Sequence, residues 1–229
     1  YNETTAKKGA DDVASLLYHF CSTILDQNVR HLELFCDSCA GQNKNYTMLR
    51  LLHAMVHKFD RFDSIKVTFP QRGHSYMECD KDMGLIKQNV HIEVPSDWNE
   101  HVRNSRSKPS PFTVIEAEPH MFSKWGSFLT PHYKQKCPFA TRPITEIFID
   151  KSIVRTINGR SSYNGAWESY IIASTSFDTF VEQEMGPEQA YARSLPISRE
   201  KYNDLQVLSQ FCQQPGASAF YKSLTTQED

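Results

Sequence analysis

The chain lacks several features that would assign it quickly to a class. No apolar run approaches the roughly 18 residues needed to cross a bilayer, so we expect no membrane partner. Lysine and arginine (25) do not outnumber aspartate and glutamate (27), so any contact with nucleic acid must be local. The Walker loop, the GxSxG elbow and the GxGxxG fingerprint are absent as well. Composition therefore gives no support to a membrane protein, a P-loop enzyme or a dinucleotide-binding enzyme.

A disulfide framework and a secretory signal are also missing. The six cysteines show no spacing typical of small disulfide-rich domains, and reduced thiols are expected. The N-terminus is polar, with neither a signal peptide nor an initiator methionine. We therefore expect an intracellular protein of the nucleus or cytoplasm, and an excised domain whose true start lies upstream.

What is present is enough apolar residues, 39% of 229, to fill a substantial core. Helical spacing of these residues predicts helices over residues 9–27 and 46–58. Period-two alternation predicts strands over residues 31–36 and 64–69. Two strands joined by one helix favour parallel neighbours, whose following loops leave from the same edge of the sheet. That edge is where open α/β sheets place their functional sites.

The rest of the chain predicts an α/β fold with a mixed α+β C-terminal extension. We expect a core over residues 1–95 and an extension over residues 96–229 that packs on it. Further predicted elements are helices over residues 81–90 and 119–128, strands over residues 112–116, 145–149 and 167–172, and a helix capped by Ser198.

The loop after the first strand carries Asp37 and a polar run. A carboxylate at the end of a buried strand can hold a divalent cation such as Mg²⁺ or Mn²⁺. The run supplies amides and a cation that could bind a phosphate at a helix N-terminus. The alternative is that these side chains only cap the helix and the turn. The candidate substrate-binding residues are Gln42, Asn43, Lys44 and Asn45.

The loop after the second strand carries His74, Glu78, Asp80 and Asp82. If the two loops converge, Asp80 and Asp82 could join Asp37 around two metal ions that activate water for phosphodiester cleavage. His74 could act as a general base. The alternative is an acidic helix start that complements the helix dipole. If Mg²⁺ or Mn²⁺ binds, we expect it to contact Asp37, and binding to weaken sharply in Asp37→Asn.

A zinc site is a weaker possibility. Cys36-x-x-Cys39 could combine with Cys79 and His74 as a Cys₃His set, although the ligand spacing is only half present. A redox role is weaker still, because the pair straddles a strand end instead of opening a helix.

Two long motifs resemble a known family. Residues 35–45 (FCDSCAGQNKN) and 73–82 (GHSYMECDKD), with residues 8–15 and 195–205, resemble an uncharacterised domain of animal proteins derived from transposable elements. The resemblance implies an RNase H-like, DDE-transposase-type fold, with a mixed sheet flanked by helices. It implies that Asp37 is the acid after the central strand, and that His74 and Asp80 form the second part of the catalytic set.

The chain departs from that family in two ways. A further aspartate of the family lies on an early strand that would precede Tyr1. An Ile-Glu pair that often follows the second motif is Ile86-Lys87 here, and a lysine cannot ligate a cation. The leading hypothesis is a transposon-derived domain with ancestral metal-dependent activity on DNA and an incomplete catalytic set. The alternatives are a non-catalytic module that binds nucleic acid or protein, and a zinc-stabilised interaction domain.

Overall fold

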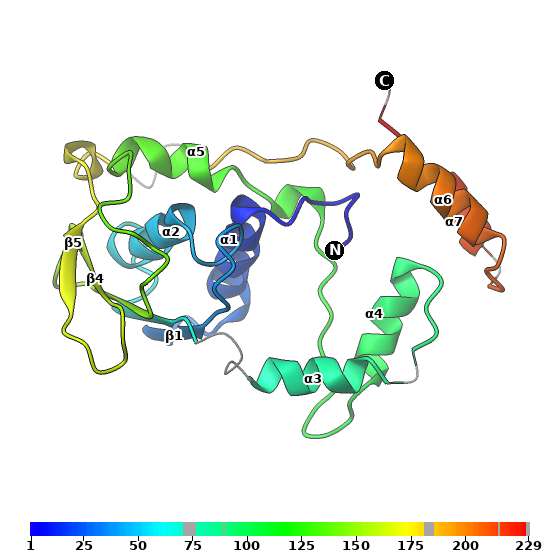
Figure 1. Ribbon diagram of the computed structural model, residues 1–229, viewed down its shortest axis with the longest axis horizontal. Coiled ribbons are helices and arrows are strands. Elements are labelled where there is room, and N and C mark those ends of the chain that lie inside the picture. The colour runs from blue at the N-terminus through cyan, green and yellow to red at the C-terminus, as the bar shows by residue number, and fades with distance from the viewer. Residues whose placement is uncertain (71–76, 89, 181–185, 215, 228–229) are drawn as a thin grey trace. The chain divides into compact units, whose positions relative to one another are not determined.

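The computed structural model describes residues 1–70, 77–88, 90–180, 186–214 and 216–227 (Figure 1). It divides into two compact units. Unit 1 comprises Tyr1–Lys7, Tyr76–Pro119 and Arg193–Asp229, and unit 2 comprises Lys8–Ser75 and His120–Ala192. This division differs from the boundary expected at residue 95, because strands from the second half of the chain complete the sheet of unit 2. Among the described residues, no helix is long and apolar enough to span a membrane.

Unit 2 is built on one five-stranded mixed sheet, which agrees with the predicted α/β class. The first two strands are parallel and every other neighbouring pair is antiparallel. The strand order follows the sequence: β1 (His31–Phe35), β2 (Ser64–Thr68), β3 (Glu146–Asp150), β4 (Thr156–Arg160) and β5 (Glu168–Ile171).

The predicted parallel pair with its helical crossover is confirmed. β1 and β2 align from His31 opposite Ser64 to Phe35 opposite Thr68, and α2 (Tyr46–His57) connects them. Alternation in β2 buries Ile65 against the helices and leaves its neighbours half-buried. The loops after β1 and β2 therefore begin at the same edge of the sheet.

Helix α2 lies at the centre of unit 2, with every residue from Met48 to Val56 buried. It packs beside α1 (Ala10–His19) and α5 (Trp125–Leu129), and the three helices lie together in Figure 1. The buried part of the helix includes one arginine, Arg50. The guanidinium of Arg50 donates to Thr130 Oγ1 at 2.9 Å and to the Lys134 carbonyl at 2.9 Å. A buried polar group with partners of this kind holds distant segments against the helix.

The first helix is shorter than predicted. α1 passes into a π-helical turn, η1 (Phe20–Ile24), and the chain then becomes extended. Buried Arg61 binds carbonyls within and after this turn: its Nε donates to Cys21 O at 2.6 Å and its Nη1 to Val29 O at 2.7 Å. These bonds draw the last carbonyls out of the regular helical ladder, so the helix ends before residue 27.

Unit 1 is helical in its described part. Ser198 caps its third helix as predicted, accepting from Lys201 N at 3.3 Å. The helix predicted over residues 81–90 begins earlier, because Asp80 closes a capping box with Met77. The helices are α3 (Glu78–Ile86), α4 (Pro95–Asn104), α6 (Arg199–Ser209) and α7 (Ala217–Lys222).

The strands predicted over residues 145–149 and 167–172 are present as β3 and β5, whereas one predicted strand is absent and one strand was not predicted. Residues 112–116 form no strand; they belong to unit 1, whose described residues contain no strand to pair with them. β4 escapes prediction because Asn158 and Gly159 have low strand propensity. A larger residue would be crowded there, since a Cβ on Gly159 would lie 3.2 Å from the Tyr170 ring and 3.3 Å from Ile147. Residues 119–128, predicted as one helix, contain the turn η2 (Pro119–Met121) and most of α5.

Two histidines on α2, the buried His53 and the half-buried His57, make the stability of unit 2 depend on pH. The rings of His53 and His57 lie 4.3 Å apart, and neither Nε2 atom has a hydrogen-bond partner in the described part of the chain. His53 Nδ1 lies 3.1 Å from the Tyr133 hydroxyl. Burial lowers the pKa of both rings, that of His57 to about 4. The carboxylate of Asp150 favours the charged form of His57, but its effect is smaller than that of burial.

We expect the urea midpoint of unit 2 to fall as the pH drops from about 6.5 towards 4. The unfolded rings titrate near 6.5, so between these pH values the unfolded state binds more protons than the folded state. Hydrogen exchange of the α2 amides in urea measures the effect. His57→Gln should flatten the pH dependence, and the exposed His31→Gln should not. An α2 stability that is constant from pH 7 to pH 5 would contradict this account.

Candidate functional site

The loop after β1 is organised by Asp37 itself. Its Oδ1 accepts from Asn43 Nδ2 at 2.7 Å and from the Cys39 amide at 3.2 Å. The side chain is exposed at the end of β1, at the predicted edge of the sheet. The structure therefore gives Asp37 the turn-forming role that was the alternative to a metal ligand, with one oxygen already in use.

The amides of the polar run have structural partners too. Asn45 caps α2, accepting from Met48 N at 2.9 Å, while its Nδ2 donates to Gln42 O at 2.9 Å. Gln42 Nε2 in turn donates to the Lys8 carbonyl at 3.3 Å. The loop is thus a connected set of hydrogen bonds that holds its shape without a ligand.

Lys44, which was expected to bind substrate, is buried in the structure. It is only 9% exposed; its ammonium donates to Arg142 O at 3.0 Å and lies 4.8 Å from the centre of the Phe69 ring. Burial lowers the pKa of Lys44. A phosphate contact through this ammonium would require it to leave a buried position, so the described geometry does not support that role.

The acids of the second motif also have partners. Asp80 Oδ2 accepts from the Met77 amide at 2.8 Å and so caps α3. Asp82 forms an ion pair with Arg106 Nη1, at 3.1 and 3.2 Å. Glu78 pairs with Lys81 at 3.2 Å. His74, the predicted general base, lies outside the described residues.

The predicted metal ligands fall in the two different units of the structure. Asp37 belongs to unit 2, whereas Asp80 and Asp82 belong to unit 1. Within the ranges that the structure describes, no three histidine, cysteine, aspartate or glutamate side chains are arranged to hold a metal ion. The zinc set is divided in the same way, between Cys36 and Cys79, and burial raises the pKa of Cys36 to about 11.

Sequence reasoning missed two groups of residues near the sheet. Lys8 and Arg142 are exposed cations beside the loop, since their carbonyls bind Gln42 and Lys44. No local pattern could reveal Arg142, which lies 98 residues from Lys44 along the chain. The pair His53 and His57 had a visible signal, because histidines four residues apart on a helix share one face.

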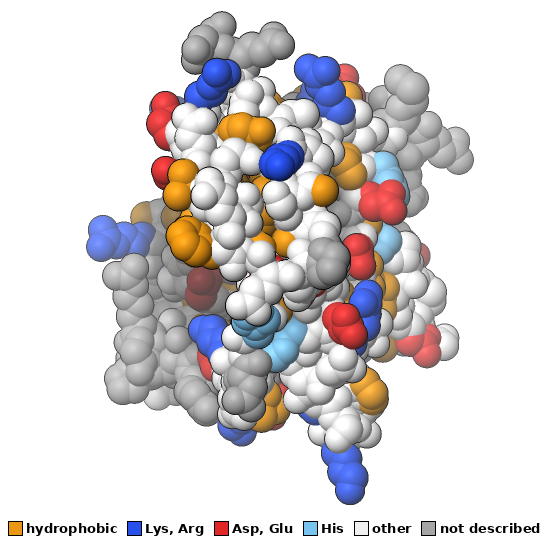
Figure 2. Space-filling model, turned by 90° about the vertical axis from the view of Figure 1, so that its right-hand side faces the viewer, with side chains coloured by type: hydrophobic (Ala, Val, Ile, Leu, Met, Phe, Trp, Pro, Cys, Tyr) orange, Lys and Arg blue, Asp and Glu red, His pale blue; other side chains and the backbone are white. Residues whose placement is uncertain are grey.

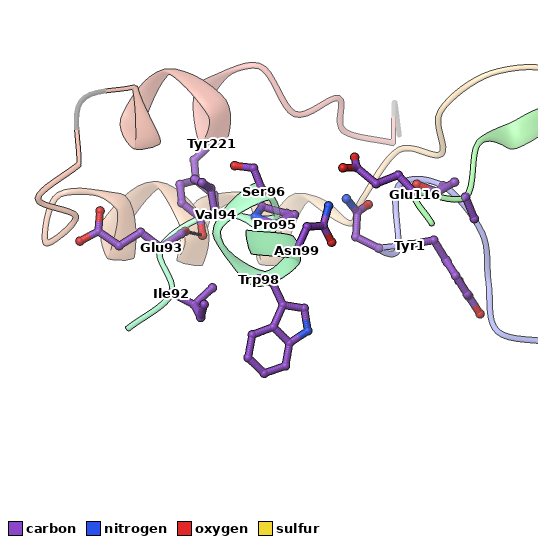
Figure 3. A pocket seen from close by; sticks show the side chains of 13 residues that line it. Tyr1, Ile92, Glu93, Val94, Pro95, Ser96, Trp98, Asn99, Glu116 and Tyr221 are labelled. Carbon is purple, nitrogen blue, oxygen red and sulfur yellow. Dashed lines mark hydrogen bonds between the residues drawn. The ribbon is translucent and has the colours of Figure 1, made fainter. Parts of the chain in front are cut away.

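Unit 1 contains a cavity of about 470 Å³ (Figure 3). Its lining includes Tyr1, Trp98, Glu116 and Tyr221, and Figure 3 shows Trp98 and Glu93 pointing away from one another. The Glu93 carboxylate accepts from the Gln213 amide at 2.8 Å, so it is used in joining segments of the unit. None of the predicted site residues lines this cavity, and it lends no support to the predicted centre.

No protein-family model, curated protein or solved structure matches the chain. The motifs and the geometry of the loop after β1 are therefore the features that bear on the function of the chain.

The role of Asp37 in its loop predicts different effects for two substitutions. Asp37→Ala removes the acceptor for Asn43 and Cys39 and should lower the free energy of unfolding of unit 2 by about 1 kcal/mol. Asp37→Asn keeps a carbonyl oxygen in that place and should cost less than half as much. Urea unfolding followed by hydrogen exchange of α2 measures both. If the asparagine variant loses as much free energy of unfolding as the alanine variant, the negative charge of Asp37 stabilises the loop, and its role as a hydrogen-bond acceptor does not.

Proposed function

We propose that this chain is a transposon-derived RNase H-like domain that binds DNA at the loop after β1 and does not cleave it. The scaffold supports this, because a parallel β–α–β unit presents Asp37 and its loop at the carboxyl edge of the sheet. The long motifs in residues 35–45 and 73–82 support the same family.

The loss of cleavage rests on one observation: each predicted acidic ligand already has a structural partner. Cleavage with two metal ions needs about three convergent acids to fix both ions and the scissile phosphate. Asp37 holds Asn43, Asp80 caps α3, and Asp82 binds Arg106. Lys87 ends α3 where the family often has an acid. These structural partners favour a structural role for the acids over a two-metal centre built on Mg²⁺ or Mn²⁺.

The DNA contact is local and rests on the cations beside the loop. Lys8 and Arg142 are exposed, and their backbone carbonyls accept from Gln42 and Lys44 of the loop. On the face drawn in Figure 2, basic side chains are separated by acidic and apolar ones and form no broad patch. A few phosphate contacts at one edge predict weak binding that depends on salt.

We expect Lys8→Gln with Arg142→Gln to weaken DNA binding and to reduce the salt slope by roughly 2, since two phosphate contacts are lost. Fluorescence anisotropy with labelled single- and double-stranded DNA at several salt concentrations measures this. The matched control is Lys151→Gln. Lys151 follows β3 beside the start of β2, at the end of the strands opposite to the loop after β1. Its replacement should therefore leave DNA binding unchanged.

The same DNA, incubated with Mn²⁺ and run on a gel, tests the loss of cleavage. The proposal predicts no products from the chain or from its Asp37→Ala form. Cleavage by the chain that disappears in Asp37→Ala would contradict the proposal. Equal DNA affinity of the double variant and the Lys151→Gln control would show that DNA does not bind through Lys8 and Arg142 beside the loop.

A further inference from the structure

Unit 1 contains a segment, residues 106–117, whose backbone is held by few interactions. It lies between α4 and η2, and no backbone–backbone hydrogen bond joins it to any described part of the chain. Residues 107–111 are all exposed. A segment with few backbone hydrogen bonds and little burial leaves its place at a low cost in free energy. It can therefore enter the cleft of a modifying enzyme.

Ser110 is the nucleophile that this segment presents. It stands between Pro109 and Pro111, it is exposed, and its hydroxyl has no hydrogen-bond partner in the part of the chain that the structure describes. A proline after the serine has no backbone N–H, and proline-directed protein kinases recognise their substrates by a proline in that position. Proline also favours an extended backbone at the residue before it. An extended backbone is the conformation that a kinase cleft binds.

The chain has one other serine or threonine that is followed by proline, Thr130-Pro131. The Oγ1 of Thr130 donates to Gly126 O at 2.6 Å and accepts from Arg50 Nη1 at 2.9 Å. The same residue begins the helical turn η3 (Thr130–His132). Thr130 would have to lose these bonds to enter a kinase cleft in an extended conformation. The structure therefore distinguishes two sites that share one sequence motif.

A cation stands beside Ser110. Arg106 Nε donates to the Ser110 carbonyl at 3.0 Å, and the guanidinium lies 3.8 Å from the centre of the Phe112 ring. The Nη1 of the same arginine forms the ion pair with Asp82 of α3. One arginine thus joins the segment to α3.

A phosphate on Ser110 would compete for this arginine. The carbonyl that Arg106 binds and the hydroxyl that would carry the phosphate belong to one residue, so the phosphate lies within reach of the guanidinium. A phosphoserine carries a charge of about −1.5 to −2 at pH 7 and three strong acceptor oxygens. Asp82 offers a single negative charge, and arginine forms its strong bidentate pairs with phosphate as well as with carboxylate. The phosphate is therefore the stronger partner.

We propose that a proline-directed protein kinase phosphorylates Ser110, and that the phosphate then takes Arg106 from Asp82. In the transfer the Ser110 hydroxyl oxygen forms a bond to the γ-phosphorus of ATP, and the bond from that phosphorus to the β–γ bridging oxygen breaks. The hydroxyl proton passes to a base of the kinase, and ADP leaves. Bonds between the phosphate and Arg106 replace the ion pair, so the segment is released from α3 and Asp82 becomes free on the helix of the second motif.

The site is tested by incubating the chain with ATP, Mg²⁺ and each of two purified proline-directed kinases, one cyclin-dependent and one mitogen-activated. Mass spectrometry of the peptides should find one phosphate at Ser110 and none at Thr130. Ser110→Ala should abolish incorporation. Pro111→Ala keeps the hydroxyl and removes the recognised proline, so incorporation should be largely lost. No incorporation at Ser110 with either kinase, or equal incorporation in Pro111→Ala, would overturn the assignment.

The exchange of Arg106 has a separate readout, the ³¹P signal of the phosphorylated chain as a function of pH. Phosphoserine without a partner loses its second proton near pH 6. A bound guanidinium favours the dianion, so the midpoint should lie about half a pH unit lower in the phosphorylated chain than in its Arg106→Gln form. Asp82→Asn removes the competing carboxylate and should lower the midpoint further. Arg103→Gln is the matched control, because Arg103 pairs with Glu116 instead, and should leave the midpoint unchanged.

Equal midpoints with and without Arg106 would overturn the exchange, as would a midpoint that Asp82→Asn does not change. None of these results depends on DNA binding, so this inference and the proposed function fail separately.

Discussion

The complete burial of α2 is the constraint on which the rest of unit 2 depends. A helix enclosed from Met48 to Val56 places its polar residues where partners from other segments stabilise them, since an unpaired buried polar group is costly. Arg50 meets this requirement by binding the chain at Thr130 and Lys134. The same helix joins β1 to β2 and makes them parallel. Its position thus sets both the register of the sheet and the edge from which the candidate loop leaves.

The N-terminal cap of α2 connects this buried helix to the candidate site, because the capping residue Asn45 belongs to the loop after β1. Asn45 binds both Met48 and Gln42, so the loop cannot change shape without loosening the helix. Asp37 is held in turn through Asn43. The polar residues that suggest catalysis in the sequence are therefore the same ones that build the loop. A surface that binds DNA through neighbouring cations is compatible with such a loop.

The central part of the fold was predictable because its signals are local. Alternation in β2 and helical spacing in α2 follow from which side chains are buried, and the parallel pairing follows from the length of the connection. β4 was not predictable, because Gly159 is selected by the close approach of Tyr170 and Ile147. The return of the strands after residue 145 to the same sheet leaves no local signal either, because it depends on pairing between segments that are distant in the sequence.

The candidate site was predictable in position but not in chemistry. The sequence places Asp37 at the end of β1, where the structure has it. It could not reveal that Lys44 is buried, because the Arg142 carbonyl that binds it is distant in the sequence. Nor could composition separate an acid that ligates a metal from one that caps a helix, since Asp80 suits both roles and only its bond to Met77 distinguishes them.

The central claim is that the acids of the two motifs act separately, as structural groups. Paramagnetic broadening of backbone amide signals by substoichiometric Mn²⁺ tests it most directly. The account predicts weak broadening near Asp37 and near Asp80 that is independent, so that Asp37→Asn leaves the signals around Asp80 unchanged. Strong broadening of both regions by the same Mn²⁺, removed from both by Asp37→Asn, would show one shared metal centre and contradict the account.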